Sequence, residues 1–289
     1  LSGLLRKGNV KPMPLRLIAA FALFLSVPAL AHADVSVLRY VTALPDDAVV
    51  LDSRSVTACE KHSLADARCL SAADFLGPHN RLAGFADIAW VLGSAGLDGA
   101  ESVLVVGDNP IQRDFVAGLL YLMGQSHVSV LARAVNTINA PRAPGRTRAM
   151  VRTKIWQAPA RAKAVVFKNE VHRLLTSRPG VVLLDGRSEE AYWGKAIYAA
   201  RGGHLPGADH LPAARLRADV VRGKALGPAT ENAIVYSHHA VDGIAFMTLI
   251  VAGTGVRVRV FPGGWAEWAS NASLPADAET FPSPLRKGG

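Results

Sequence analysis

A five-residue motif occurs twice in the chain, and each copy begins the same succession of elements. Residues 51–55 read Leu-Asp-Ser-Arg-Ser, and residues 184–188 read Leu-Asp-Gly-Arg-Ser. Each copy lies at the end of a short apolar run and is followed by another apolar run, a turn and a long helical pattern. We therefore expect an internal duplication of about a hundred residues, which a fold of this chain must accommodate as two related halves.

The first half alternates between predicted strands and predicted helices. Apolar runs at residues 49–52, 103–106 and 128–131 predict buried strands. Helical spacing predicts helices over residues 85–92 and 111–123, which end before Gly96 and Gly124. This alternation indicates a parallel sheet with helices on both faces.

The second half repeats the alternation. The expected elements are a helix around residues 171–175, strands at 181–185 and 234–236, a helix over 240–252 that stops at Gly253, and a strand at 256–260. The last segment alternates strictly between valine and arginine, so we expect its arginines to face solvent.

The segment between the halves contains three prolines, several arginines and little periodicity, which is typical of a linker. The expected parts are therefore residues 1–33 for upstream residues and a leader, 34–140 for the first domain, 141–163 for the linker, 164–275 for the second domain and 276–289 for a tail.

The leader has the order of a secretory signal peptide. Lys11 and Arg16 precede an apolar run at residues 17–25, and small residues precede a cleavage site after Ala33. The run is shorter than the ~20 residues of a membrane span, although a retained anchor is an alternative. Met13 is a natural start, and a start there would make residues 1–12 upstream read-through; Leu1 is the alternative. We expect a periplasmic or secreted protein.

Charge excludes one class of partner. The net charge is +9, and removal of the four leader cations leaves 28 cations and 23 acids, a net charge of +5. Basic residues do not alternate with aromatic residues, so we expect no nucleic-acid partner, and no membrane partner after cleavage. A mildly basic exported protein suits a small anionic ligand.

The two cysteines, Cys59 and Cys69, lie ten positions apart in the first half. In an oxidising compartment we expect them to form a disulfide. Two buried free thiols and a reactive thiol are the alternatives.

Four segments of the second half resemble the rhodanese family of sulfurtransferases. They are residues 183–188, the loop Arg-Gly-Gly-His-Leu-Pro-Gly-Ala at 201–208, residues 234–243, and the segment Phe-Pro-Gly-Gly-Trp-Ala-Glu-Trp at 261–268. The resemblance covers residues 166–275 well and 35–131 weakly. It implies an α/β fold of two rhodanese-like domains, each a parallel sheet flanked by helices on both faces, with a degenerate first domain and Asp108 at its nucleophile position.

The chain departs from the family at the nucleophile. Directly after the strand that ends at Tyr236, where the family has a cysteine that forms a persulfide, this sequence has Ser237. A serine hydroxyl is a much weaker acid than a thiol and cannot form a persulfide. Enzyme status therefore stays open. The active loop implied by the resemblance comprises Ser237, His238, His239, Ala240, Val241 and Asp242.

Three interpretations of this loop remain. In the first, which we favour, persulfide chemistry is lost. The loop is then either a remnant or a site that binds a small anion, a sulfur-containing ligand or a protein partner. In the second, His238 or His239 activates Ser237 for hydrolysis. In the third, sulfur transfer persists by an unusual mechanism through Cys59 or Cys69.

The resemblance also assigns supporting roles. It implies that Asp185 and Arg187 form a structural pair that braces the loop, that Arg201 and His204 support the site, and that Trp265 and Trp268 pack the last helix on the sheet. Ala191 occupies a position where thiosulfate-handling and mercaptopyruvate-handling members often have arginine, which argues against thiosulfate specificity.

A rival hypothesis is a periplasmic metal-binding accessory protein. Its candidate ligands for zinc or copper are His204, His210, His238, His239 and Asp242. We prefer structural roles for these side chains, and expect no metal and no cofactor.

Overall fold

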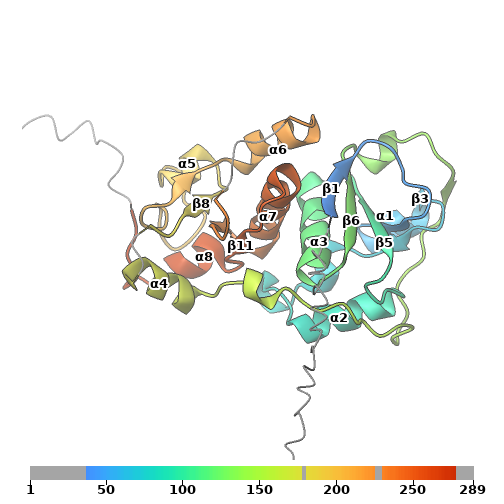
Figure 1. The fold of residues 1–289 in the computed structure, drawn as a ribbon, viewed down its shortest axis with the longest axis horizontal. Helices are drawn as coiled ribbons and strands as arrows, with labels where there is room; N and C mark the ends of the chain where they lie inside the picture. The colour runs from blue at the N-terminus through green and yellow to red at the C-terminus, as the bar shows by residue number, and fades with distance from the viewer. Residues whose placement is uncertain (1–36, 178–179, 225–229, 278–289) are drawn as a thin grey trace, which may run out of the picture. The chain divides into compact units, whose positions relative to one another are not determined.

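The structure is a computed structural model that describes residues 37–177, 180–224 and 230–277. It has an α/β fold in which parallel sheets are flanked by helices, as the sequence predicts (Figure 1). The expected leader, its cleavage site after Ala33, the start at Met13 and residues 278–289 of the expected tail lie outside the described residues.

The first half forms a five-stranded sheet in the order β1-β6-β5-β2-β4. Every neighbouring pair in this sheet is parallel, and Leu51 lies opposite Val105 in the register of β2 and β5. The strands are β1 (Val37–Val41), β2 (Val49–Asp52), β4 (Arg68–Cys69), β5 (Ser102–Val106) and β6 (His127–Leu131).

Alternate side chains of β5 enter different hydrophobic clusters. Val103 and Val105 pack with side chains of the helices α2 (Phe85–Ser94) and α3 (Pro110–Leu122). Leu104 and Val106 pack in a smaller cluster that includes Val135 of the 3-10 helix η3 (Val135–Thr137). This alternation is expected for a strand whose two faces are both covered. The remaining elements of this half are α1 (Val56–Lys61), β3 (Ser63–Leu64), η1 (Ala72–Phe75) and η2 (Pro78–Asn80).

The second half forms a four-stranded parallel sheet in the order β11-β10-β8-β9. One hydrophobic cluster contains side chains of β10 together with Val171, Trp265 and Trp268. Both tryptophans are almost completely buried. The strands are β8 (Leu183–Asp185), β9 (Asp209–His210), β10 (Ile234–Tyr236) and β11 (Arg259–Val260), and the helices are α4 (Lys168–Ser177), α5 (Glu189–Tyr192), α6 (Ala213–Val221), α7 (Ala240–Thr254) and α8 (Gly264–Ala269).

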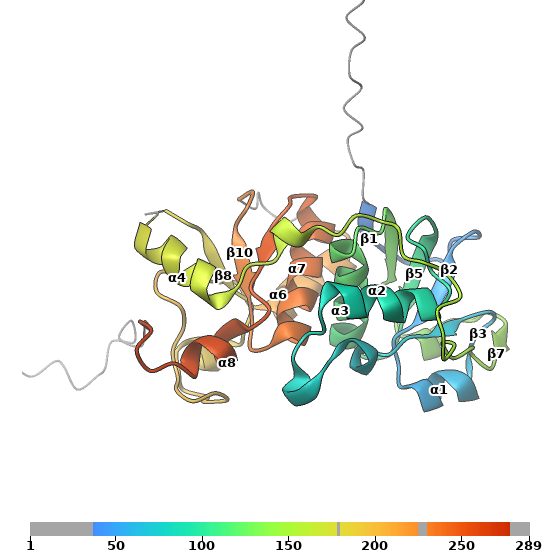
Figure 2. The ribbon, with the colours of Figure 1, turned by 90° about the horizontal axis from the view of Figure 1, so that it is seen from below.

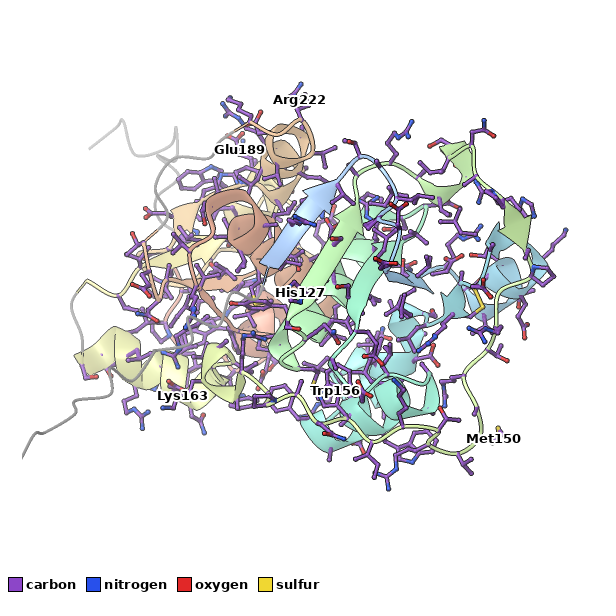
Figure 3. The ribbon with its side chains drawn as sticks, turned by 45° about the vertical axis from the view of Figure 1, so that its right-hand side comes forward. His127, Met150, Trp156, Lys163, Glu189 and Arg222 are labelled. Carbon is purple, nitrogen blue, oxygen red and sulfur yellow. A yellow bond between two sulfur atoms is a disulfide. The ribbon has the colours of Figure 1, made fainter. Side chains whose placement is uncertain are left out.

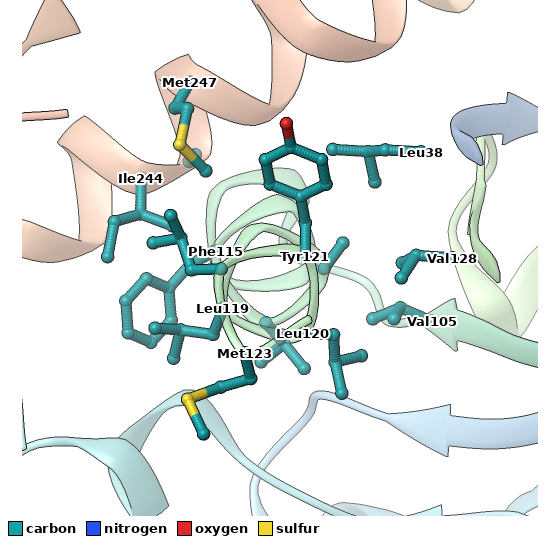
Figure 4. Close-up of a cluster of buried hydrophobic side chains, with 14 of the residues drawn as sticks. Leu38, Val105, Phe115, Leu119, Leu120, Tyr121, Met123, Val128, Ile244 and Met247 are labelled. Atoms are coloured by element: carbon teal, nitrogen blue, oxygen red, sulfur yellow. The ribbon is translucent and has the colours of Figure 1, made fainter. Parts of the chain in front are cut away.

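The two halves share one hydrophobic core. Helix α3 of the first half packs against α7 of the second half, and Phe115 and Ile244 belong to the same buried cluster (Figure 4). Figure 4 shows Ile244 and Met247 on one side of α3 and Val105 and Val128 on the other. The core therefore continues from one sheet through both helices to the other.

Residues 141–163 lie along the first half. The segment forms the short strand β7 (Arg142–Ala143) and the start of the 3-10 helix η4 (Ala162–Ala164), and Figure 2 shows it as a yellow-green trace from β7 to α4. Its main-chain N–H groups at Ala149, Gln157 and Arg161 donate hydrogen bonds to carbonyl oxygens of the first half, with N–O distances of 2.7–2.9 Å. Met150, labelled in Figure 3, is 90% exposed between these attachments.

A disulfide joins Cys59 in α1 to Cys69 in β4, with 2.05 Å between the sulfur atoms. It is the yellow bond drawn in Figure 3. Both residues are buried, and the main-chain N–H of Gly145 donates a hydrogen bond to the Cys59 carbonyl oxygen.

Two sequence-based boundaries are wrong. The helix expected to stop at Gly253 continues to Thr254, because the chain leaves the helix at Gly255, which has the left-handed φ of 71°. The strand expected over residues 256–260 contains only Arg259–Val260, which pairs with β10 and forms an isolated parallel bridge to Val165. Arg259 is also not simply directed to solvent, because its guanidinium binds Glu170.

Within the residues that the structure describes, no helix is both long and apolar enough to cross a membrane.

Candidate functional site

The Ser237–Asp242 loop joins the end of β10 to the first turn of α7. Ser237 is 5% exposed, and its hydroxyl makes no hydrogen bond with a described residue. The carbonyl oxygens of Ser237 and His238 accept hydrogen bonds from the N–H groups of Trp265 and Ala266, at 2.8 and 3.1 Å. Two main-chain hydrogen bonds therefore fix the carbonyl groups of the loop to the first turn of α8.

Gly264 makes this approach of α8 possible. Its φ is +55°, and a Cβ atom at this position would lie 2.4 Å from the Ser237 carbonyl oxygen and 2.7 Å from that of His238. Any side chain would therefore displace either the helix or the loop. The Gly-Gly pair before Trp265 was visible in the sequence, but its contact with the loop required the fold.

The N-terminus of α7 is left without a side-chain cap. His239 occupies the N-cap position, and its ring accepts no hydrogen bond from the helix. The N–H groups of Ala240, Val241 and Asp242 donate to no acceptor among the described residues, and Gly243 is the first to bond, to the His239 carbonyl oxygen. Such a helix end attracts anions, through its free N–H groups and the helix dipole.

The equivalent turn of the first half is closed. There α3 follows β5, and the Asn109 side chain accepts hydrogen bonds from Ile111 and Gln112, at 2.9 and 3.2 Å. Pro110, at the first helical position, has no N–H to satisfy. The Asp108 carboxylate accepts a hydrogen bond from the Asn136 N–H and lies 3.6 Å from an Arg54 nitrogen. The two halves therefore differ in whether the helix end is open.

Asp185 and Arg187 form the expected pair, deep in the protein. Asp185 is fully buried and Arg187 is 4% exposed. The Arg187 Nη2 atom lies 2.6 Å from Asp185 Oδ2 and 2.8 Å from the Gly203 carbonyl oxygen. The guanidinium also lies 5.0 Å from the centre of the Trp265 ring. The pair thus ties the end of β8 to the 201–208 loop and to α8.

The first half contains the same arrangement. Arg54 Nη2 lies 2.6 Å from Asp52 Oδ2 and 2.6 Å from the His62 carbonyl oxygen, and Arg54 Nε lies 3.0 Å from Asp52 Oδ1. In the second half the Nε–Oδ1 distance is also 3.0 Å. The repeated sequence motif therefore corresponds to a repeated hydrogen-bond arrangement.

Arg201 and His204 make structural contacts. Arg201 donates to the carbonyl oxygens of Asn271 and Leu274, at 3.2 and 2.7 Å. His204 is 2% exposed, and its ring stacks on Tyr192 with 3.8 Å between centroids. Burial lowers the pKa of His204, so the ring is neutral at neutral pH.

His238 lies inside the site with both ring nitrogens buried and without a hydrogen-bond partner among the described residues. The Tyr198 ring meets it edge to face, with 5.5 Å between centroids. Burial, and to a smaller extent the positive charge of Arg187, lowers the pKa of His238 to about 4. His239 is exposed, and burial raises the pKa of the Asp242 carboxyl. Sequence reasoning did not foresee the burial of His238.

The proposed metal ligands do not meet. Among the described residues, no three histidine, cysteine or acidic side chains are grouped so that they could hold a metal ion. His210 Nε2 is instead 3.0 Å from the Arg187 carbonyl oxygen, and His204 is stacked on Tyr192. The metal-binding hypothesis therefore has no site in this part of the chain.

A cavity of about 590 Å³ lies beside the loop, and His239 and Ala240 form part of its wall. Residues 80–85 of the first half also line it, and α8 contributes Ala266 and Glu267. We refer to this space as the loop cavity. Residues 80–84 were not recognised from the sequence, because they belong to no motif or periodic pattern. Phe85 was recognised only as the start of a helix, and the fold alone brings these residues to the loop.

Comparisons with known proteins agree with this geometry. Residues 168–271 match the family described as "Rhodanese-like domain". The thiosulfate sulfurtransferase of Azotobacter vinelandii is 31% identical over 110 residues, which cover 34% of this chain and 40% of that protein. The putative thiosulfate sulfurtransferase SseB of Mycobacterium tuberculosis is 32% identical over 115 residues, which cover 35% and 39%. The chain thus matches about 40% of the length of these curated relatives.

Solved structures resemble a larger part of the chain. The crystal structure of a probable thiosulfate sulfurtransferase aligns with a TM-score of 0.58 and 25% identity, covering 81% of this chain and 99% of that one. The crystal structure of YnjE aligns with a TM-score of 0.63 at 17% identity, covering 82% and 64%, which is a likeness of fold alone. Residues 168–271 are therefore similar to a rhodanese-like domain, and part of the chain is similar to thiosulfate sulfurtransferases.

Proposed function

We propose that the protein is an exported member of the rhodanese family that binds a small anion at the Ser237–Asp242 loop without forming a cysteine persulfide. In this proposal the two halves are tandem rhodanese-like domains, and only the second retains an open site. Ser237 stands where the family has its nucleophile and leaves the loop as a binding site.

The observation that carries the proposal is the difference between two equivalent helix ends. Asn109 caps α3, whereas no side chain caps α7, and the N–H groups at residues 240–242 have no acceptor among the described residues. A buried or half-buried helix end with free donors is a costly arrangement, unless a ligand or water accepts from it. An anion satisfies these donors and interacts favourably with the helix dipole.

The state of the two cysteines supports the proposed loss of persulfide chemistry. The chain has two cysteines, and both are in the disulfide between Cys59 and Cys69 in the first half. Sulfur loading requires a thiolate, and a serine hydroxyl cannot replace it. Hydrolysis by Ser237 is also not favoured, because the His238 ring makes no hydrogen bond to the Ser237 hydroxyl.

Intact-mass measurement tests the loss of persulfide chemistry. The purified protein and a Ser237→Cys variant are incubated with thiosulfate and, separately, with 3-mercaptopyruvate. We expect no added sulfur on the wild type and one added sulfur on the variant, because the variant restores a thiol at the end of β10. A gain of sulfur on the unreduced wild type would overturn the proposal. A gain only after reduction would instead assign transfer to Cys59 or Cys69, and would also contradict it.

Calorimetric titration with thiosulfate tests anion binding. His239→Asn copies the cap that Asn109 supplies in the first half, so its side chain competes with the anion for the same N–H groups. We expect binding to the wild type and an affinity at least about fivefold weaker in the variant. Equal affinities would show that the anion binds elsewhere. No binding to the folded wild type would refute the assignment of an anion site.

A further inference from the structure

We infer that the anion bound by this protein carries an apolar body about the size of an aromatic ring system, which fills the loop cavity. The inference rests on the proposed function, because the loop is taken to hold the charged group. The inference specifies the chemical class of the uncharged part of the ligand.

The size of the cavity is the first argument. Its volume of about 590 Å³ lies within the ~300–1,000 Å³ range of small-molecule sites. A sulfate-sized anion occupies only a small part of such a space. The remainder would then hold water against apolar walls, which is unfavourable compared with filling it by an apolar group.

The walls are the second argument, because most of their side chains are apolar and come from both halves. Those that define the body of the ligand are Leu82, Phe85, Val165, Phe167 and Pro262. Phe167 lines the cavity while 68% of its surface is exposed. A ligand in the cavity would cover part of this ring, and the burial of apolar surface favours binding.

The polar groups of the wall are few, and one cation among them is unpaired. Glu267 lies 3.7 Å from Lys168 Nζ, which offsets its charge. The Arg81 side chain makes no ion pair or hydrogen bond with another described residue. A few charged groups in a mainly apolar cavity orient an amphiphilic ligand. The unpaired guanidinium selects a negative group rather than a positive one.

A series of sulfonates that share one headgroup tests the inference. Methanesulfonate, benzenesulfonate and naphthalene-2-sulfonate are titrated into the purified protein by calorimetry. We expect affinity to rise along the series, by at least about tenfold from the first to the last, as more apolar surface is buried. Benzenesulfonamide, which is neutral, should bind more weakly than benzenesulfonate.

Single substitutions locate the apolar body. Phe167→Ser should weaken naphthalene-2-sulfonate binding by about fivefold or more and leave methanesulfonate unchanged, because it removes an apolar wall and no charge. Ile197→Ser is the matched control, since Ile197 is 62% exposed and does not line the cavity, and it should change neither affinity. Arg81→Gln should weaken all the sulfonates by a similar factor.

The outcomes separate this inference from the proposed function. If all three sulfonates bind with equal affinity and His239→Asn weakens their binding, the inference of an apolar body is wrong and the proposed anion site is retained. Tight naphthalene-2-sulfonate binding that Phe167→Ser does not weaken would place the ligand elsewhere and overturn the inference. Failure of thiosulfate and all sulfonates to bind would overturn both.

Discussion

The hydroxyl of Thr248 in α7 donates a hydrogen bond to the main-chain carbonyl oxygen of Asp114 in α3, with 2.8 Å between the oxygen atoms. Both residues are fully buried. The Asp114 carboxylate also lies 2.9 Å from Arg217 of α6, so main-chain and side-chain atoms of one residue bind two helices of the other half. The junction between the halves is therefore a packed interior that contains polar contacts between the two halves.

Gly118 permits the close approach of α3 to α7. A Cβ atom on Gly118 would lie 2.4 Å from Thr248 Oγ1 and 2.6 Å from Ile244 Cγ2. We expect Gly118→Ala to lower the free energy of unfolding in urea by about 1–3 kcal/mol through overpacking. Gly77→Ala is the control, because its Cβ would have only an ordinary contact at 3.7 Å. Equal stability of the two variants would show that the junction tolerates added volume.

The two helix ends predict opposite effects of capping substitutions. Asn109→Ala removes the cap of α3 and should lower the free energy of unfolding by about 0.5–2 kcal/mol. His239→Asn supplies a cap to α7 and should raise it by about 1 kcal/mol in the absence of anion. Urea unfolding of both variants checks this. Destabilisation by His239→Asn would mean that its side chain does not reach the free N–H groups.

Arg187 neutralises a carboxylate that has no access to water. Arg187→Ala leaves Asp185 buried without its partner and should lower the free energy of unfolding by about 3–5 kcal/mol. Arg222→Ala, which breaks an exposed ion pair with Asp219, should change it by less than about 1 kcal/mol. Arg187→Lys should also destabilise, because an ammonium cannot reproduce the forked contacts. Chemical denaturation compares the three, and an Arg187→Lys variant of wild-type stability would contradict the assigned role.

His238 should make stability depend on pH. Its pKa is about 4 in the folded protein, and ~6.5 is expected for an unfolded chain. Above pH ~6.5 the ring is neutral in both states and its contribution is constant. As the pH falls from ~6.5 towards 4, the unfolded chain binds the proton more readily, so the folded state loses stability.

His238→Gln removes this titration while other groups are retained. We expect the stability of wild type relative to the variant to decrease between pH 6.5 and 4, as measured by urea unfolding at each pH. An NMR titration of the His238 ring should give its midpoint near 4. A relative stability that is flat over this range would show that the ring is accessible to water.

The disulfide between Cys59 and Cys69 closes a short loop, since the cysteines are ten positions apart. Loop-closure entropy predicts that a Cys59→Ser/Cys69→Ser double variant loses about 2–3 kcal/mol of unfolding free energy. Reductant should destabilise the wild type to a similar extent and leave the double variant unchanged. A wild type that is insensitive to reductant under unfolding conditions would contradict this.

The elements that could be predicted from the sequence are those whose signals are local. The apolar run of β2 and the end of α3 before Gly124 depend on residues in or next to the element itself. The strand at 256–260 was predicted too long. Alternation of apolar and polar residues indicates that one face is buried, whereas the length of a strand depends on how many residues pair with the adjacent strand. The end of α7 was misplaced because either of two nearby glycines could stop a helix, and only Gly255 adopts the left-handed conformation.

The candidate site was predictable only in part. The loop could be located because strand, turn and helix are contiguous at residues 234–243. His238 packs against Tyr198, and the loop cavity is lined by Phe167 and residues 80–85. No motif or periodic pattern connects these residues to the loop. The N-terminus of α7 has no side-chain cap, whereas Asn109 caps α3. This difference became apparent only when the two halves were compared in the structure.

The burial of α7 also bears on how the two halves can evolve. Residues 243–251 of this helix are buried without interruption, and α7 contacts α3 and β1 of the first half as well as β10 and β11 of its own. A fragment limited to residues 168–271 would expose the surface of α7 that α3 covers. The segment that carries the family resemblance is thus smaller than the unit that shares this hydrophobic core. Loss of the first half in evolution would expose this surface of α7, even though the helix end of the first half is itself closed.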